Sequence, residues 1–411
     1  MSVVALSEML GAAVRDASGL VRGRVREVAV SPQEHPTRMA FLVVRTTSGD
    51  RMLPADAVKS FGVTVRSTSD AQSWLPFTSF DGVLLLKRDL LDQQIIDVHG
   101  RKVVRVNDVE LFSNPVDDRI LLDVLAVDVG ARGAVRRLAK GLVPAFTLRA
   151  LLEKIPPRVI PWQYVDLIET DPARRVKLKI AYEGLSKMHP ADIADIVEDL
   201  APAEQKAVFE ALDDEVAAEA LEEIDPDVQV AIVESLDSNR AADIVEEMDP
   251  DAAADLLGDL TEDRSGEILK EMEPEERQEV TQLLEFGEHT AAGRMTTEFV
   301  AVSDEGTVAD AIDALREFEG SGEAVATIYL VSTGNLLAGA VPLVRIAISP
   351  PDMRLKSIAE TPPTCAPDTP EREVAEIFDK YNLITLAVAD EHGRLAGIIT
   401  ADDVISMLRH G

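Results

Sequence analysis

The hydrophobic pattern is most regular between residues 189 and 284, where the chain divides into eight consecutive units of twelve residues, for example DPDVQVAIVESL and DSNRAADIVEEM. Positions 8 and 12 of each unit are nearly always apolar, which predicts one short helix with one apolar stripe. Asp or Thr is common at position 1 and Pro at position 2, as is typical of helix amino termini. Because helices this short are unstable alone, we expect them to stack as an all-α superhelical repeat.

Alternating valines and an internal duplication characterise the first 170 residues. The segment LGAAVRDASGLVRGRVREV aligns without gaps on LDQQIIDVHGRKVVRVNDV, and this places Asp16 over Asp97 and Gly19 over Gly100. The alternation predicts short, half-buried antiparallel strands joined by glycine turns. The two halves end alike, in LPADAV and IPWQYV, so we expect two copies of one small β unit.

This β pattern resembles the PRC-barrel, a small β-barrel of the photosynthetic reaction centre and of a ribosome-maturation factor. The resemblance covers most of residues 5–170 and implies a duplicated β-barrel domain over residues 1–170. Two basic islands, GARGAVRRLAKGL and ARRVKLKI, interrupt the acidic chain. We interpret residues 171–188 as a basic linker, and the alternative is a surface that docks against the acidic helices that follow.

Residues 287–411 show a mixed pattern of two similar β–α–β–β–α units. In the second unit APDTPEREVAEIFDKY predicts a capped helix, LITLAVAD and LAGIIT predict strands, and ADDVISMLRH predicts a closing helix. The first unit has the same order, from VAVSDEGTVADAIDALREF through VATIYLV and LLAGAV. The predicted fold class is multidomain α and β, with a β-barrel, an all-α superhelical repeat and an α/β pair.

Charge is concentrated in the helical repeat. The chain has 74 Asp and Glu against 41 Lys and Arg, a net charge of −33, and the repeat alone has 31 acids against 5 bases. Such a field repels phosphate backbones and anionic lipids, so nucleic acid is excluded as a general partner. Cations and basic protein surfaces are the favoured partners.

The remaining composition excludes several classes of protein. A single cysteine, Cys365, excludes an intramolecular disulfide and suits a reducing compartment. The start MSVVALSEML lacks the basic region of a signal peptide, and no run of about 20 apolar residues would span a bilayer. The histidines are scattered singly and no phosphate loop is present, so we expect a cytoplasmic protein that is not an enzyme.

The motifs HTAAGRMTTEFVAV and GRLAGIITADDVISML resemble the CBS pair of the MgtE magnesium transporters, and the acidic repeat resembles their amino-terminal domain. The resemblance covers about residues 185–410 and implies an MgtE N-like domain at 189–286 and a CBS pair at 287–411. In that family the two domains clamp divalent ions when magnesium is plentiful, and the clamp closes a membrane pore. The chain has the clamp without the pore, and Mg²⁺ is the implied ligand.

The resemblance implies Asp251, Asp255 and Asp403 as metal ligands. The i, i+4 spacing of the first two puts both carboxylates on one helix face, which suits a hard, hydrated cation, whereas two ordinary surface acids are the alternative. Other family acids are missing, because their positions hold Pro370, Asn382 and Ser406.

CBS modules also bind adenine nucleotides through the pattern G-x-x-T-x-x-D. Gly397, Thr400 and Asp403 fit that pattern, which implies ATP or another adenine nucleotide as a second ligand. In the first unit the corresponding positions hold Gly339, Pro342 and Arg345, so that half-site is degraded.

The predicted function is that of a soluble magnesium-responsive and adenine-nucleotide-responsive regulator, related to the sensor region of MgtE. It would act in trans on a partner such as a membrane transporter, contacted through the barrel domain, and would form a homodimer through the CBS pair. The alternatives are a constitutive scaffold whose sensing has decayed and an accessory subunit of magnesium transport.

Overall fold

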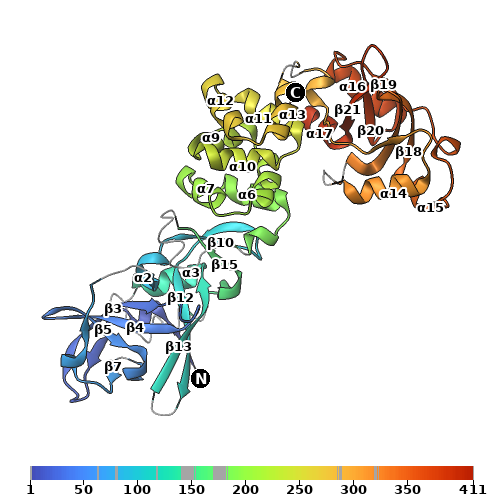
Figure 1. Ribbon diagram of the computed structural model, residues 1–411. Helices are drawn as coiled ribbons and strands as arrows, with labels where there is room; N and C mark the ends of the chain where they lie inside the picture. The colour runs from blue at the N-terminus through green and yellow to red at the C-terminus, as the bar shows by residue number, and fades with distance from the viewer. Residues whose placement is uncertain are drawn as a thin grey trace. The chain divides into compact units, whose positions relative to one another are not determined.

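The chain forms two compact units, Met1–Val216 and Ala217–Gly411, whose boundary falls inside the helical repeat (Figure 1). The structure is a computed structural model that describes residues 2–62, 64–78, 82–116, 119–139, 152, 154–169, 182, 184–284, 286, 289–318, 322 and 324–410. Most of the predicted basic linker, residues 171–181 and 183, lies outside the described residues, as do residues 140–142 of the first basic island.

The first unit begins with three sheets whose strands pair antiparallel, except that β2 and β7 are parallel. The largest has the order β6 (Val58–Ser60), β7 (Thr64–Ser67), β2 (Ala13–Arg15), β3 (Val21–Val30), β4 (Met39–Thr46), β5 (Gly49–Pro54) and β8 (Leu75–Pro76), with β9 (Leu84–Leu85) on β3. The second has the order β1 (Ser2–Ala5), β12 (Asp108–Val116), β13 (Arg119–Asp128) and β14 (Val159–Pro161), and the third β11 (Lys102–Arg105), β10 (Gln94–Asp97) and β15 (Val165–Leu167). No closed barrel is formed by the residues described.

The predicted duplication is visible in the order of the elements, because both halves contain a short helix, a hairpin, a long strand and a 3₁₀ turn. The short helices are α1 (Leu6–Met9) and α2 (Leu86–Asp89), and the turns are η1 (Ala55–Ala57) and η3 (Trp162–Tyr164). The halves also exchange their first strands. Strand β1 pairs with β12 of the second half, whereas β9 pairs with β3 of the first half. One hydrophobic core, from Leu6 to Ile160, is therefore shared by both halves.

The duplicated aspartates fix the hairpin turns. Asp16 is buried and its Oδ1 accepts a hydrogen bond from the backbone N–H of Leu20 at 3.1 Å. Asp97 is also buried and accepts from the backbone N–H of Gly100 at 2.9 Å. A Cβ at position 100 would lie 2.2 Å from the Asp97 carboxylate, so the predicted glycine is required there by close approach.

A buried polar cluster attaches helix α3 (Ala131–Ala139) to the second sheet. The Arg136 guanidinium donates to the Asp108 carboxylate at 3.0 Å, and its other Nη lies 3.9 Å from Asp128. The hydroxyl of Ser7 donates to the same Asp108 oxygen at 2.5 Å. Both aspartate side chains are fully buried, and Oδ2 of Asp128 accepts no hydrogen bond from the part of the chain that the structure describes. Burial raises the pKa of Asp128 above its ordinary value.

The helical repeat, here called the array, contains the eight predicted helices. They are α6 (Pro190–Glu198), α7 (Pro202–Phe209), α8 (Asp214–Glu222), α9 (Pro226–Ser235), α10 (Ser238–Glu246), α11 (Pro250–Asp259), α12 (Glu262–Glu271) and α13 (Pro274–Leu284). Proline occupies the first helical position in five of them, and the Asp237 and Thr261 side chains accept the N-cap hydrogen bonds of α10 and α12. The sequence prediction of the array is confirmed.

Within the second unit, array helices pack on their second neighbours: α9 on α11, α10 on α12 and α11 on α13. Carboxylates link helices that are three apart in the array, because Glu222 of α8 accepts from the backbone N–H of Asp249 at the start of α11, at 2.7 Å, and Glu246 of α10 accepts from that of Glu273, just before α13. Both links span 27 residues. Helices α11 and α13 thus each receive a carboxylate at their amino terminus from the third helix before them, in addition to their apolar packing.

The carboxy-terminal part, here called the paired units, has the predicted β–α–β–β–α order twice. The first unit contains β16 (Ala301–Ser303), α14 (Val308–Glu317), β17 (Thr327–Ser332), β18 (Leu336–Pro342) and α15 (Leu343–Ile348). The second contains β19 (Thr364–Cys365), α16 (Glu371–Tyr381), β20 (Thr385–Ala389), β21 (Leu395–Thr400) and α17 (Ala401–His410). In both sheets the central strand is parallel to the first and antiparallel to the third.

The paired units are joined reciprocally. The backbone N–H of Leu337 donates to Gly393 at 3.0 Å, and that of Leu395 donates to Asn335 at 3.0 Å. The hydroxyl of Tyr329 is bonded to that of Thr385 at 2.8 Å in the core between the sheets. Among the residues described, no helix combines the length and apolar character needed to cross a membrane.

Candidate functional site

The amino terminus of α11 positions two of the predicted ligands. Asp249 is the N-cap and Pro250 occupies the first helical position, so Asp251 lies in the first turn and Asp255 one turn later. The third predicted ligand, Asp403, lies in the first turn of α17. One oxygen of Asp403 accepts hydrogen bonds from Thr400, from its backbone N–H at 2.7 Å and from its hydroxyl at 2.6 Å. The orientation of Asp403 is therefore fixed from within its own unit.

The structure brings Asp251 and Asp403 into the same acidic cluster, between α11 and α17. Burial, followed by the charges of Asp403 and Asp249, raises the pKa of Asp251 well above its ordinary value. Oδ1 of Asp251 is fully buried and accepts no hydrogen bond from the residues described. Burial raises the pKa of Asp403 to about 7 despite its hydrogen bonds from Thr400. Among the residues described, Oδ1 of Asp251 is therefore an acceptor without a donor in a cluster of mutually repelling carboxylates.

The same cluster extends into the array through Glu222. Burial and the neighbouring Asp249 raise the pKa of Glu222 to about 8. Asp249 is affected in the same direction, by burial and then by Asp402. The acids of α8, α11 and α17 consequently disfavour one another's ionised form.

Asp255 has a different neighbour. It forms an ion pair with Arg294 of the 3₁₀ turn η5 (Ala292–Arg294), and Nε of Arg294 donates to Glu371 at 2.8 Å. Burial disfavours the charged guanidinium, but the carboxylates of Asp255 and Glu371 outweigh burial and raise the pKa of Arg294. The structure thus divides the three predicted metal ligands between two places.

The separation of the three predicted ligands determines whether they could hold a divalent cation. No three His, Cys, Asp or Glu side chains in the described part of the chain are grouped closely enough to hold a metal ion. Magnesium retains several waters and is commonly bound by only one or two carboxylates. Asp251 and Asp403, with the buried acceptor of Asp251, fit a hydrated Mg²⁺, whereas Asp255 already has a cationic partner.

The residues predicted to bind nucleotide have contacts within the fold. A Cβ at Gly397 would lie 2.8 Å from both the Met295 sulfur and the carbonyl oxygen of Thr296. The absence of a side chain therefore lets Thr296 pair with Ile398 through two backbone hydrogen bonds, at 2.8 and 3.0 Å. The backbone N–H and the hydroxyl of Thr400 both donate to Asp403. The nucleotide role of Gly397, Thr400 and Asp403 stays a prediction.

Three side chains at this junction, Arg294, Glu371 and Glu222, are absent from the sequence-based site. A signal for the first was present, because Arg294 is the one basic residue between Arg277 and Arg316 in the sequence. Glu371 follows Pro370, a position where the family resemblance expects an acid. Glu222 belongs to a dense run of acids that does not distinguish it from its neighbours.

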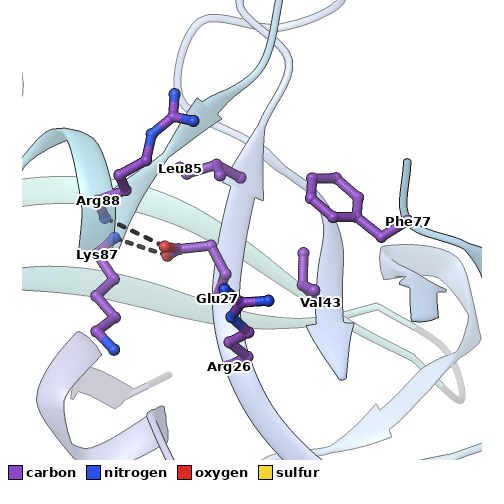
Figure 2. Close-up of a pocket in the computed structure, with 7 residues that line it drawn as sticks. All are labelled: Arg26, Glu27, Val43, Phe77, Leu85, Lys87 and Arg88. Carbon is purple, nitrogen blue, oxygen red and sulfur yellow. Dashed lines mark hydrogen bonds between the residues drawn. The ribbon is translucent and has the colours of Figure 1, made fainter. Parts of the chain in front are cut away.

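A separate pocket of about 260 Å³ lies in the first unit and is lined by Arg26, Glu27, Val43, Phe77, Leu85, Lys87 and Arg88 (Figure 2). Figure 2 shows the Glu27 carboxylate turned towards the backbone of α2, where the N–H groups of Lys87 and Arg88 donate to it at 2.7 and 3.1 Å. Burial raises the pKa of Glu27. The N–H of Val28 also donates to Glu27, at 3.0 Å. Glu27 therefore serves a structural role, in which its carboxylate fixes the position of α2.

Comparisons with known proteins match the array and the second of the paired units. Residues 188–289 match the family model of the MgtE intracellular N domain, and residues 355–410 match that of the CBS domain. The magnesium transporter MgtE of Thermus thermophilus is 35% identical over 133 residues, 32% of this chain and 30% of that protein. MgtE of Enterococcus faecalis is 29% identical over 135 residues, 33% and 30% of the two chains. The chain spans about 30% of the length of these relatives.

Two solved structures are similar to about half of this chain. The crystal structure of the soluble part of a magnesium transporter has a TM-score of 0.53 and 25% identity, and covers 55% of this chain and 90% of that one. The cytosolic domain of the Mg²⁺ channel MgtE in complex with ATP has a TM-score of 0.51 and 29% identity, and covers 56% and 94%. The predicted MgtE N-like and CBS regions are confirmed, whereas the predicted PRC-barrel is not.

Proposed function

We propose that this chain is a magnesium-responsive regulator, in which a hydrated Mg²⁺ between Asp251 and Asp403 draws the array against the CBS pair. The observation that carries the proposal is the buried Oδ1 of Asp251, which lacks a donor and lies in a cluster with Asp403. A carboxylate buried in this way is expensive unless a proton or a cation neutralises it. Magnesium would supply that charge at neutral pH.

The Coulomb energy sets the size of the effect. Two unit charges about 4 Å apart repel by roughly 4 kcal/mol at an effective dielectric of about 20. Asp249, Asp251 and Asp403 all contribute to this repulsion. A divalent ion between the carboxylates reverses its sign, and Asp403 is held in place for such an ion by Thr400. Few direct ligands are available, so the binding should be weak.

The comparisons support the direction of the proposal. The relatives named above are magnesium transporters, and one structural neighbour is an ATP complex. We infer that the chain responds to Mg²⁺ and passes the response to a partner protein such as a transporter in trans. Nucleotide binding at Gly397, Thr400 and Asp403 belongs to the same proposal as a second input.

Exposed apolar side chains support a homodimer through the CBS pair. Helix α15 exposes 66% of Val344 and 73% of Ile348, and α17 exposes 59% of Ile405. Ile384, before β20, is 64% exposed. A second copy of the chain would cover such side chains through a two-fold, isologous interface.

Small-angle scattering of the full chain tests the magnesium response. Millimolar MgCl₂ should reduce the radius of gyration relative to NaCl at equal ionic strength, and Asp251→Asn should blunt the reduction. Asp263→Asn is the matched control, because Asp263 is an exposed first-turn acid of α12. Superimposable curves for the unmodified chain with and without magnesium would favour the constitutive scaffold instead.

A further inference from the structure

The segment that connects the array to the CBS pair, residues 290–294, contains a positively charged side chain, that of Arg294. Residues 290–292 are fixed to the CBS pair by backbone hydrogen bonds, from Ala291 to Thr369 at 2.7 Å and from Ala292 to Pro367 at 2.9 Å. The turn η5 that follows contacts both α11 and α13 of the array. Arg294, at the end of this turn, is therefore held by the backbone of the CBS pair and lies next to the array.

The Arg294 guanidinium contacts one carboxylate from the array and one from the CBS pair. It forms the ion pair with Asp255 on α11 and donates through Nε to Glu371, the first residue of α16. The three side chains are 27%, 38% and 23% exposed, so the contacts are partly screened from water. Two further charged groups act on this pair among the residues described: His289, whose Nδ1 lies 3.4 Å from Glu371, and Asp403, which favours the charged guanidinium.

We infer that Arg294 is a resident counter-ion that holds α11 against α16 without metal, so that a divalent cation is needed only at the Asp251–Asp403 end of the junction. A guanidinium binds two carboxylates through separate N–H donors and never loses its proton in a protein. It therefore does at Asp255 and Glu371 what a divalent ion would do there. Asp255, predicted as a metal ligand, is assigned to Arg294 instead.

This inference deepens the proposed function and rests on it for the role of magnesium at Asp251. Arg294 acts in the metal-free state. Arg294 tethers one end of the junction while the acids at the other end repel. The tether limits how far the array departs from the CBS pair when magnesium is withdrawn.

Distance measurement by double electron–electron resonance tests the tether. Spin labels replace Glu262 on α12 and Asp379 on α16, both exposed, and Cys365→Ala removes the native thiol. In chelator-treated protein, Arg294→Met should raise the population of long distances about tenfold relative to the parent, the change expected on removing a half-buried, charge-assisted pair. Arg372→Met is the matched control, because Arg372 lies on α16 with a 92% exposed side chain and pairs with Glu376 of the same helix.

A double-mutant cycle and a metal count complete the test. Asp255→Asn should open the metal-free protein as Arg294→Met does, and the two changes together should add little to either. In the Arg294→Met variant, titration with Mn²⁺ followed by the resonance of the free ion should reveal one additional bound ion, which Asp255→Asn should remove. Equal metal-free distances in the Arg294→Met and Arg372→Met variants, or additive effects in the cycle, would overturn the inference.

The outcomes separate this inference from the proposed function. If Arg294→Met opens the metal-free protein but no variant responds to magnesium, the tether stands and the magnesium proposal fails. If magnesium compacts the parent and Asp251→Asn blunts this, but Arg294→Met matches its control, the magnesium proposal stands and the tether fails.

Discussion

Replacing Arg136 by methionine removes the guanidinium that faces two fully buried carboxylates in the first unit. The side chain of Arg136 is 10% exposed, and those of Asp108 and Asp128 are 0% exposed. Methionine fills a similar volume, so the change removes charge with little loss of packing. Asp108 keeps its hydrogen bonds from Ser7, whereas among the residues described Asp128 keeps the one from the backbone N–H of Gly130 at 2.9 Å.

Breaking one side of a buried ion pair costs about 3–5 kcal/mol, because an uncompensated charge remains in the interior. We therefore expect the first unit to lose that much of its free energy of unfolding at neutral pH. The neighbouring Arg137→Met is the control. Arg137 pairs with Asp92, whose side chain is 59% exposed, and such pairs contribute about 0–1 kcal/mol.

The pH dependence gives the prediction a sign. Burial raises the folded-state pKa of Asp128 above its unfolded value, so the folded state binds more protons and stability falls as pH rises through that interval. Loss of Arg136 raises this pKa further. The destabilisation should consequently be smaller at about pH 5 than at about pH 8.

Tryptophan fluorescence in a urea titration is the assay. The two tryptophans, Trp74 and Trp162, both belong to the first unit, so their emission reports its unfolding separately from the second. If Arg136→Met and Arg137→Met shift the urea midpoint equally, or if the loss from Arg136→Met is independent of pH, the reasoning from buried charge is wrong.

Further predictions concern the second unit. Because the pKa of Asp403 is about 7, protons should compete with magnesium, and the magnesium concentration for half-compaction by scattering should rise as pH falls from about 8 to about 6. Glu222→Gln should change stability little at pH 7, because Glu222 has a pKa of about 8 and is mostly neutral there. Glu222→Ala should lower the free energy of unfolding by about 1–3 kcal/mol, because it leaves the Asp249 N–H unpaired; thermal melts of the two variants test this difference. Ile348→Glu should convert the expected dimer to a monomer by light scattering, and a monomeric parent would contradict the CBS interface. Asp403→Ala should abolish ATP binding by calorimetry; unchanged affinity would place any nucleotide elsewhere.

Local signals in the sequence determined which parts of the fold could be predicted. The array helices begin where Pro and the N-cap residues stand, because capping depends on neighbours within four residues. The duplication also predicted the paired turns at Asp16 and Asp97. Alternation alone does not specify partners, however, so the exchange of β1 and β9 between the halves, and the absence of a closed barrel in the described residues, were not foreseen.

The candidate site was predicted in the same partial way. Asp251 and Asp255 both belong to α11, where their spacing puts them on one helix face, but the spacing gave no information on what faces each of them. That depends on segments distant in sequence, namely α17 for Asp251 and the Arg294 turn for Asp255. A helical period predicts which side chains share a surface and is silent on the charge opposite.

The exchanged first strands have a consequence for synthesis of the chain. Strand β1 pairs with β12 in a register that places Ser2 opposite Ser113, so β1 obtains its hydrogen-bonding partner only after β12 of the second half has emerged from the ribosome. Pairing over such a separation is slow, because a long loop must close before any contact rewards it. Neither half should fold as an isolated fragment, and the first half should remain a client of chaperones until β12 is available to it.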